Sequence, residues 1–176
     1  AGFAICRDVC IMNMQVEAKE HAVRRIGIFC GTFDPVHIGH LQAAQACLQA
    51  LQLERVLFVP SGKPLIRQAD ASAEHRCEMI RLTIAGHPEL VLSGIDLQPQ
   101  PRHAVDIVGE LRRRYPDAEL IYIIGANKLR DIPGWKDAGQ LMTMCSFAAY
   151  PRVGYDAPAL CGTLRFHGAR VTLVPA

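Results

Sequence analysis

Short apolar runs recur along the chain from residue 24 onward, and stretches with apolar residues at helical spacing follow several of them. Runs rich in β-branched and aromatic residues predict buried strands. The predicted strands are residues 24–30, 55–59, 90–92, 120–124, 146–150 and 171–174. Residues 120–124, Leu-Ile-Tyr-Ile-Ile, are continuously apolar, which is typical of a central strand covered on both faces.

Helical periodicity fills several of the intervals between these strands. The predicted helices start near residue 40 and near residue 72, where Ser72 is a suitable N-cap, and a third spans residues 104–111. A further helical stretch after Gly125 is broken at Pro133-Gly134-Trp135. Alternating strands and helices predict an α/β fold, with a Rossmann-like parallel sheet and helices on both faces.

Residues 1–22 do not share this pattern. The chain begins at Ala1, and Met12 and Met14 are alternative natural starts. We expect this segment to be an N-terminal extension, either disordered or partly added to the natural chain, and residues 23–176 to form a single domain.

Composition excludes several classes of protein. The net charge of +2 does not suggest a nucleic-acid-coating protein, and no apolar run approaches the roughly 20 residues that span a membrane. Arg7 and Asp8 interrupt the apolar stretch at the N-terminus, so no signal peptide is predicted and we expect a cytoplasmic location. The seven cysteines lack zinc-site spacing, which favours free thiols.

The segment Gly31-Thr32-Phe33-Asp34-Pro35-Val36-His37-Ile38-Gly39-His40 joins the first predicted strand to the first helix. Backbone N–H groups at such a helix start attract an anion such as phosphate, and His37 and His40 can both point at it. Neither a dinucleotide fingerprint nor a P-loop occurs. The residues therefore predict a phosphate site that stabilises charge without a covalent nucleophile.

The loop that follows the second predicted strand carries Lys63 and Arg67. It is long enough to act as a lid. Two interpretations remain open for these basic side chains: contact with a phosphate, or ordinary solvated loop charge.

Several motifs, in the same order along the chain, resemble those of the HxGH nucleotidyltransferases, and in particular those of the bacterial nicotinate mononucleotide adenylyltransferases. Residues 31–40 are similar to the family signature, and residues 59–64 to its second loop. Arg76 and Met79 match a helical pattern of the family. Residues 123–129 with Trp135, and residues 152–155, resemble two later segments. The resemblance implies transfer of an adenylyl group from ATP to a mononucleotide, a step of NAD biosynthesis.

The resemblance also implies roles for individual residues. His37 and His40 would be the catalytic residues that hold the ATP phosphates. The ATP and phosphate site would comprise Gly31, Thr32, Phe33, Gly39, Gly125, Asn127 and Arg67. The mononucleotide site would comprise Asp34, Trp135, His103, Asp106 and Arg152. Mg²⁺ would act with ATP without protein ligands. The partners would be ATP and a pyridine mononucleotide, with neither nucleic acid nor membrane, and a homo-oligomer remains open.

The chain departs from the family pattern at several positions. Cys30 stands in place of a glycine, Asn127 in place of an aspartate, and residues 102–105 differ from the family's Ser-Tyr-Thr-x segment, whereas Asp106 is retained. The chain also ends where a Ser/Thr/Arg segment is expected. Three hypotheses follow: an enzyme specific for nicotinate mononucleotide, a related nucleotidyltransferase with another mononucleotide, or a nucleotide-binding homologue with impaired catalysis.

Overall fold

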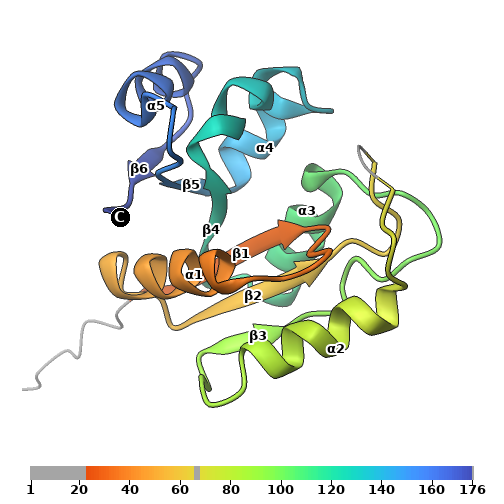
Figure 1. The fold of residues 1–176 in the computed structure, drawn as a ribbon. Coiled ribbons are helices and arrows are strands. Elements are labelled where there is room, and N and C mark those ends of the chain that lie inside the picture. The colour runs from red at the N-terminus through yellow and green to blue at the C-terminus, as the bar shows by residue number, and fades with distance from the viewer. Residues whose placement is uncertain (1–22, 66–67, 176) are drawn as a thin grey trace, which may run out of the picture.

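The computed structural model describes residues 23–65 and 68–175, which form a parallel sheet with helices around it (Figure 1). The strands of the described chain are β1 (Arg24–Gly31), β2 (Arg55–Pro60), β3 (Leu90–Leu92), β4 (Ala118–Gly125), β5 (Ser146–Tyr150) and β6 (Val171–Leu173). The helices are α1 (Ile38–Ala50), α2 (Ala73–Thr83), α3 (Ala104–Arg114), the 3-10 helix η1 (Ala126–Gly134), α4 (Ala138–Met144) and α5 (Ala157–Phe166).

The sheet has the order β3-β2-β1-β4-β5-β6, and neighbouring strands pair in parallel. Strands β2 and β3 therefore follow β1 on one side, and β4, β5 and β6 follow on the other side of β1. Ile28 of β1 lies opposite Tyr122 of β4, so Gly31 and Gly125, each three residues further on, end the two strands at the same level. This arrangement confirms the predicted Rossmann-like fold.

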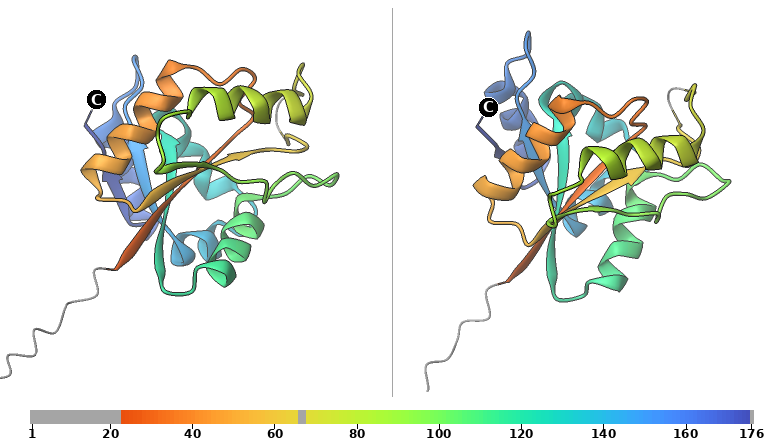
Figure 2. Two further views of the ribbon diagram at one scale, coloured as in Figure 1. Left: turned by 90° about the horizontal axis from the view of Figure 1, so that it is seen from below. Right: turned by 60° about the horizontal axis from the view of Figure 1, so that its bottom comes forward.

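Alternate side chains of the strands enter two separate hydrophobic clusters, one on each face of the sheet. Ile26, Ile28 and Tyr122 pack in the first cluster with residues of α3, η1, α4 and α5. Phe29 and Ile123 pack in the second cluster with residues of α1 and α2. Helices consequently cover both faces, as the two further views of the ribbon show (Figure 2).

Most predicted elements are confirmed, with boundary shifts of a few residues. One helix was missed: the sequence analysis assigned no element to residues 157–166, which form α5. Asp156 caps this helix by accepting from the Ala159 N–H group at 3.1 Å, and Gly168 follows its end with φ of 89°. These are ordinary start and stop signals that the apolar pattern alone did not reveal.

Three further expectations concern the N-terminal segment, the cysteines and membrane-spanning helices. Residues 1–22, which were expected to form an N-terminal extension, lie outside the described residues. The five cysteines among the described residues are free thiols, as predicted: Cys30, Cys47, Cys77, Cys145 and Cys161. Within residues 23–65 and 68–175, no helix has the length and apolar character needed to cross a bilayer.

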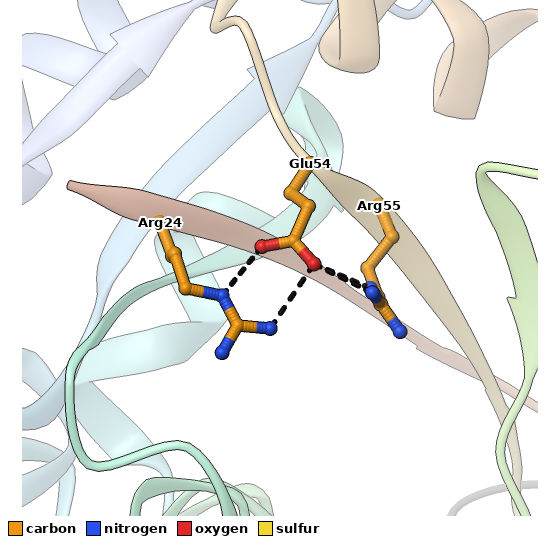
Figure 3. A network of polar contacts seen from close by, with 3 residues as sticks. All are labelled: Arg24, Glu54 and Arg55. Carbon is orange, nitrogen blue, oxygen red and sulfur yellow. Dashed lines mark hydrogen bonds and ion pairs between the residues drawn. The ribbon is translucent and has the colours of Figure 1, made fainter. Parts of the chain in front are cut away.

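A charged network joins β1 to β2 at the amino ends of the strands, opposite the carboxyl edge (Figure 3). The Glu54 carboxylate accepts from Nε of Arg24 at 2.6 Å and from Nη2 of Arg55 at 2.5 Å. These two hydrogen bonds lower the pKa of Glu54 to about 2. Since the side chains are exposed, the network is a modest and salt-sensitive link between the strands.

Replacement of Glu54 by glutamine tests this link. Because the pKa of Glu54 is lower in the folded chain, its carboxylate stabilises the fold above its ordinary pKa, and this contribution is lost as the pH falls toward 2. We expect Glu54→Gln to lower the melting temperature by at most a few degrees at neutral pH. Thermal unfolding should show this difference shrinking in acid and in 1 M salt; a difference independent of both would contradict the assignment.

Candidate functional site

The carboxyl ends of all strands lie on one edge of the sheet, and the connecting helices begin there because every described strand is parallel. The order of the sheet reverses between β1 and β4, and α/β proteins bind ligands at the carboxyl end of such a reversal. The turn between Gly31 and Ile38 follows β1 at this position, and Asn127 follows β4. The turn at residues 31–38, called the phosphate turn below, and the Gly125 segment therefore both lie at the switch point.

His37 and His40 lie against each other at the start of α1. Their ring centroids are 3.8 Å apart, and the planes are inclined by 33°. Nδ1 of His40 accepts from the backbone N–H group of His37 at 3.2 Å. A neutral imidazole that accepts at Nδ1 carries its hydrogen on Nε2, so His40 keeps one N–H donor for a ligand. Gly39 permits this arrangement, since a Cβ there would lie 3.1 Å from Nδ1 of His37.

His40 is uncharged at neutral pH. Its pKa falls to about 4, mainly because burial disfavours the imidazolium and further because the nearby His37 and Arg152 side chains oppose its protonation. His40 consequently offers a hydrogen bond rather than a full charge.

The start of α1 remains attractive to an anion. Glu74 lies in the first turn of α2 and Asp106 in that of α3, whereas the first turn of α1 has no acidic residue. The unpaired N–H groups of a helix start carry partial positive charge. Of these three helix starts, that of α1 is therefore the most suitable for phosphate.

Phe33 anchors the turn in the hydrophobic core. Its side chain is 3% exposed, although its backbone has φ of 50°, a left-handed conformation that bulky residues seldom adopt. The ring lies edge-on to Phe29 at 5.6 Å and to His40 at 5.1 Å. These contacts hold the backbone in its uncommon conformation and fix the position of His40.

Arg76 of α2 lies beneath the turn and is 1% exposed. Its Nη1 donates to the carbonyl of Thr32 at 2.7 Å, and its Nη2 donates to that of Ser61 at 2.7 Å. Its Nε donates to the carbonyl of Ala71 at 3.2 Å. One guanidinium therefore joins the loops after β1 and β2 to the segment before α2.

Asp34 links the same segments. Its Oδ2 accepts from the backbone N–H groups of Asp70 at 2.5 Å and Ala71 at 3.1 Å. This oxygen is engaged with the chain itself, and the predicted contact of Asp34 with a mononucleotide stays a prediction.

On the β4 side, the backbone of Gly125 lies close to two side chains. A Cβ at this position would lie 2.7 Å from Oδ1 of Asn127 and 3.3 Å from the hydroxyl of Tyr150. Tyr150 also contacts Phe29, with centroids 5.9 Å apart, so this side is continuous with the aromatic cluster of the turn. Burial raises the pKa of Tyr150, which keeps its hydroxyl protonated as a hydrogen-bond donor.

The opposite face of the sheet carries a second aromatic group. Trp135 is half-buried, and its ring meets Tyr122 edge-on at 5.9 Å. Cys30 lies close enough to Tyr122 for each side chain to influence the pKa of the other. Burial raises the pKa of Cys30 to about 12, so this residue is a protonated thiol that fills space rather than a nucleophile.

The polar residues before α3 are largely occupied by local contacts. Nη1 of Arg102 donates to the Ile95 carbonyl at 2.7 Å, and its Nη2 pairs with Glu110 at 2.9 Å. The His103 N–H group donates to Oδ2 of Asp106 at 3.2 Å, so Asp106 caps its own helix. The His103 side chain is half-buried at the carboxyl edge of the sheet.

Three basic side chains were considered for contact with a substrate: Arg152 for the mononucleotide, and Lys63 and Arg67 for a phosphate. Arg152 is exposed after β5 and close enough to His40 to lower its pKa. Lys63 is exposed in the loop after β2. Arg67 lies outside the described residues.

Two further features lie apart from the turn. A hollow of about 460 Å³ beside α2 is lined by Gly62, Ala73, Glu74, Cys77, Arg81, Leu97, Gln98 and Pro99, and the histidines do not line it. Across the described part of the chain, no three or more His, Cys, Asp or Glu side chains are grouped to hold a metal ion.

The predicted residues lie on two sides of the sheet. His37, His40 and Phe33 lie on the side of α1, with Arg152 nearby. Trp135 packs on the other side. The sequence analysis missed Tyr122 and Tyr150 as neighbours of the site, and it gave Arg76 no role. The apolar residues next to Tyr122 and Tyr150 predicted strands and gave no sign of a site. The partners of Arg76 are distant in the sequence, so no local pattern predicts them.

Known proteins resemble this chain over most of its length. The family described as "Cytidylyltransferase-like" matches residues 28–167. A protein of Thermomicrobium roseum named "Probable nicotinate-nucleotide adenylyltransferase" is 37% identical over 156 residues, which is 86% of this chain and 73% of that protein. A protein of Clavibacter michiganensis with the same name is 41% identical over 75% of this chain, which spans only 66% of that relative.

Solved structures share the fold. The nicotinic acid mononucleotide adenylyltransferase of Plasmodium falciparum complexed with NaAD superposes with a TM-score of 0.77 at 14% identity, covering 87% of this chain and 75% of that one. At this identity the likeness extends to the fold alone.

The protonation state of His40 is directly testable. We expect its imidazole to titrate near pH 4 in the folded protein, and nitrogen-detected NMR can follow this. Since the unfolded side chain binds a proton near pH 6.5, His40 should make the fold less stable as the pH falls from that value toward 4. Arg152→Gln should raise the pKa of His40 by removing a positive neighbour. Titration of His40 near pH 6.5 in the wild-type protein would contradict this environment.

Proposed function

The chain belongs to the nicotinate-nucleotide adenylyltransferase family of cytidylyltransferase-like proteins, and from this premise we propose that it transfers the adenylyl group of ATP to nicotinate mononucleotide. The products are nicotinate adenine dinucleotide and pyrophosphate, and the reaction is a step of NAD biosynthesis. The observation that carries the proposal is the pair of histidines at the start of α1, located at the switch point of the sheet.

In the proposed reaction, a 5′-phosphate oxygen of the mononucleotide attacks the α-phosphorus of ATP in line, and pyrophosphate leaves. The reaction needs no protein nucleophile, so catalysis rests on positioning and on stabilising the phosphoryl oxygens. Neutral His40 donates from Nε2 to such an oxygen, and the first N–H groups of α1 supply further donors. His37 lies beside His40 and supports the same role.

Adenosine is proposed to lie on the β4 side. Gly125 has no Cβ, which lets the Asn127 and Tyr150 side chains lie against its backbone, and the Asn127 amide can bond a ribose hydroxyl. Phe33, Thr32, Gly31 and Gly39 shape the phosphate turn through their backbone positions.

The mononucleotide is proposed to bind on the side of the sheet that carries Trp135. Trp135 offers an aromatic face for the pyridine ring, and Tyr122 supports it from the side. His103 and Arg152 are the candidates for the negative groups of this substrate. Arg102 is held by Glu110 and Ile95, so it shapes this region rather than reaching freely toward a ligand.

The proposal includes Mg²⁺ carried by the triphosphate. We propose that phosphate oxygens and water hold this ion, which is how Mg²⁺ commonly binds with nucleotide substrates. When bound, the ion neutralises the charge that develops on pyrophosphate. We also propose a cytoplasmic location.

An assay of pyrophosphate release tests the proposal. We expect turnover with ATP, Mg²⁺ and nicotinate mononucleotide, and lower kcat/KM with the nicotinamide analogue or with CTP. A preference for another mononucleotide or for CTP would reassign the substrate. Binding of nucleotide without turnover in any combination would identify an impaired homologue and overturn the enzymatic proposal.

His40→Ala tests the mechanism. Removal of one preorganised donor to the transition state typically lowers kcat by about 10²–10³-fold, and we expect a loss of that size. Circular dichroism should show a folded protein, because His40 lies at the edge of the core. Glu54→Gln, at the opposite end of the strands, serves as the matched control and should keep wild-type kcat. Unchanged turnover in His40→Ala would refute its assigned role.

A further inference from the structure

Arg76 presents an unusual buried charge. Its side chain is 1% exposed, and within residues 23–65 and 68–175 it has no carboxylate within salt-bridge distance. A buried guanidinium is costly unless its donors are satisfied. Three backbone carbonyls satisfy it instead: Thr32 and Ser61 at 2.7 Å each, and Ala71 at 3.2 Å.

These three carbonyls belong to three separate segments of the chain, and Arg76 contacts all three. Thr32 belongs to the phosphate turn, Ser61 to the loop after β2, and Ala71 to the segment before α2. Two additional hydrogen bonds join the same segments. The Ser61 N–H group donates to the carbonyl of Gly31 at 3.0 Å, and Asp34 accepts from the Ala71 N–H group at 3.1 Å.

Arg76 is connected to His40 through Thr32 and Phe33. Thr32 is adjacent to Phe33, whose ring lies 5.1 Å from that of His40. A shift of Thr32 would move Phe33 and then His40. Misplacement of a reacting group by about 1 Å can cost about 10²-fold in rate, so the position of Thr32 matters for catalysis.

We propose that Arg76 is a positioning residue that holds the turn after β1 against Ser61 and Ala71, so that the turn keeps the position from which His40 contacts the phosphates. The expected effect of Arg76 on catalysis rests on the proposed function. The contacts that Arg76 makes with the loops are independent of that function. Arginine is suited to the task because its planar fork donates in several fixed directions, and lysine offers a single point charge.

Arg76→Lys tests the positioning role by keeping the charge and losing the fork. We expect kcat to fall about 10–100-fold with KM for ATP changed much less, while the protein remains folded. Hydrogen exchange should accelerate at the amides of Ser61, Asp70 and Ala71, which the contacts around Arg76 protect. In Arg76→Ala, added guanidinium should restore part of the lost kcat.

Arg165→Lys is the matched control. Arg165 also donates from Nε and Nη2 to one backbone carbonyl, that of Val171, but joins α5 to β6 away from the turn. We expect its kcat and the exchange at the three amides to match the wild type.

Each remaining outcome decides one of the two proposals. Unchanged kcat and unchanged exchange in Arg76→Lys would overturn the positioning role. Failure of both Arg76 variants to fold would assign Arg76 to fold stability alone and would overturn it equally. A wild-type protein without turnover would overturn the proposed function, while the exchange of the three amides would still decide whether Arg76 holds the turn against Ser61 and Ala71.

Discussion

Strand β1 is the constraint from which the rest of the structure is positioned. It is hydrogen-bonded on both sides, to β2 and to β4, and the chain reverses its direction of growth across it. The carboxyl end of β1 therefore has neighbours from both halves of the protein. The phosphate turn could not face both the loop after β2 and the Gly125 segment from any other strand of this sheet.

Hydrophobic pattern was sufficient to predict most of the fold. The six strands lie where apolar runs occur, because strands of a parallel sheet that is covered on both faces must be apolar nearly throughout. Helix α5 was overlooked because Pro158 and Gly162 weaken its apolar periodicity, although Asp156 and Gly168 mark its ends. Its position on the sheet follows from packing of Cys161 and Leu164, which no local pattern reveals.

The candidate site was less predictable than the fold. The motif gave the position of His37 and His40 at the start of α1, since a strand-to-helix turn has a definite geometry. It could not give the protonation of His40, which depends on burial and on Arg152 from beyond β5. The partners of Arg76 were equally hidden, because Thr32 lies 44 residues away in the chain. Such contacts exist only once the sheet brings distant loops together.

The two hydrophobic clusters have a consequence for how a substitution acts. The sheet separates the packing that supports His40 and Phe33 from the packing that supports Trp135 and Tyr122. A change among the residues that pack with α3 therefore leaves the contacts of Phe33 and His40 in place. Cys30 is an example, because its side chain packs against the cluster on the α3 face and not against the cluster that contains Phe33. The two faces of the sheet thus form separate packing units.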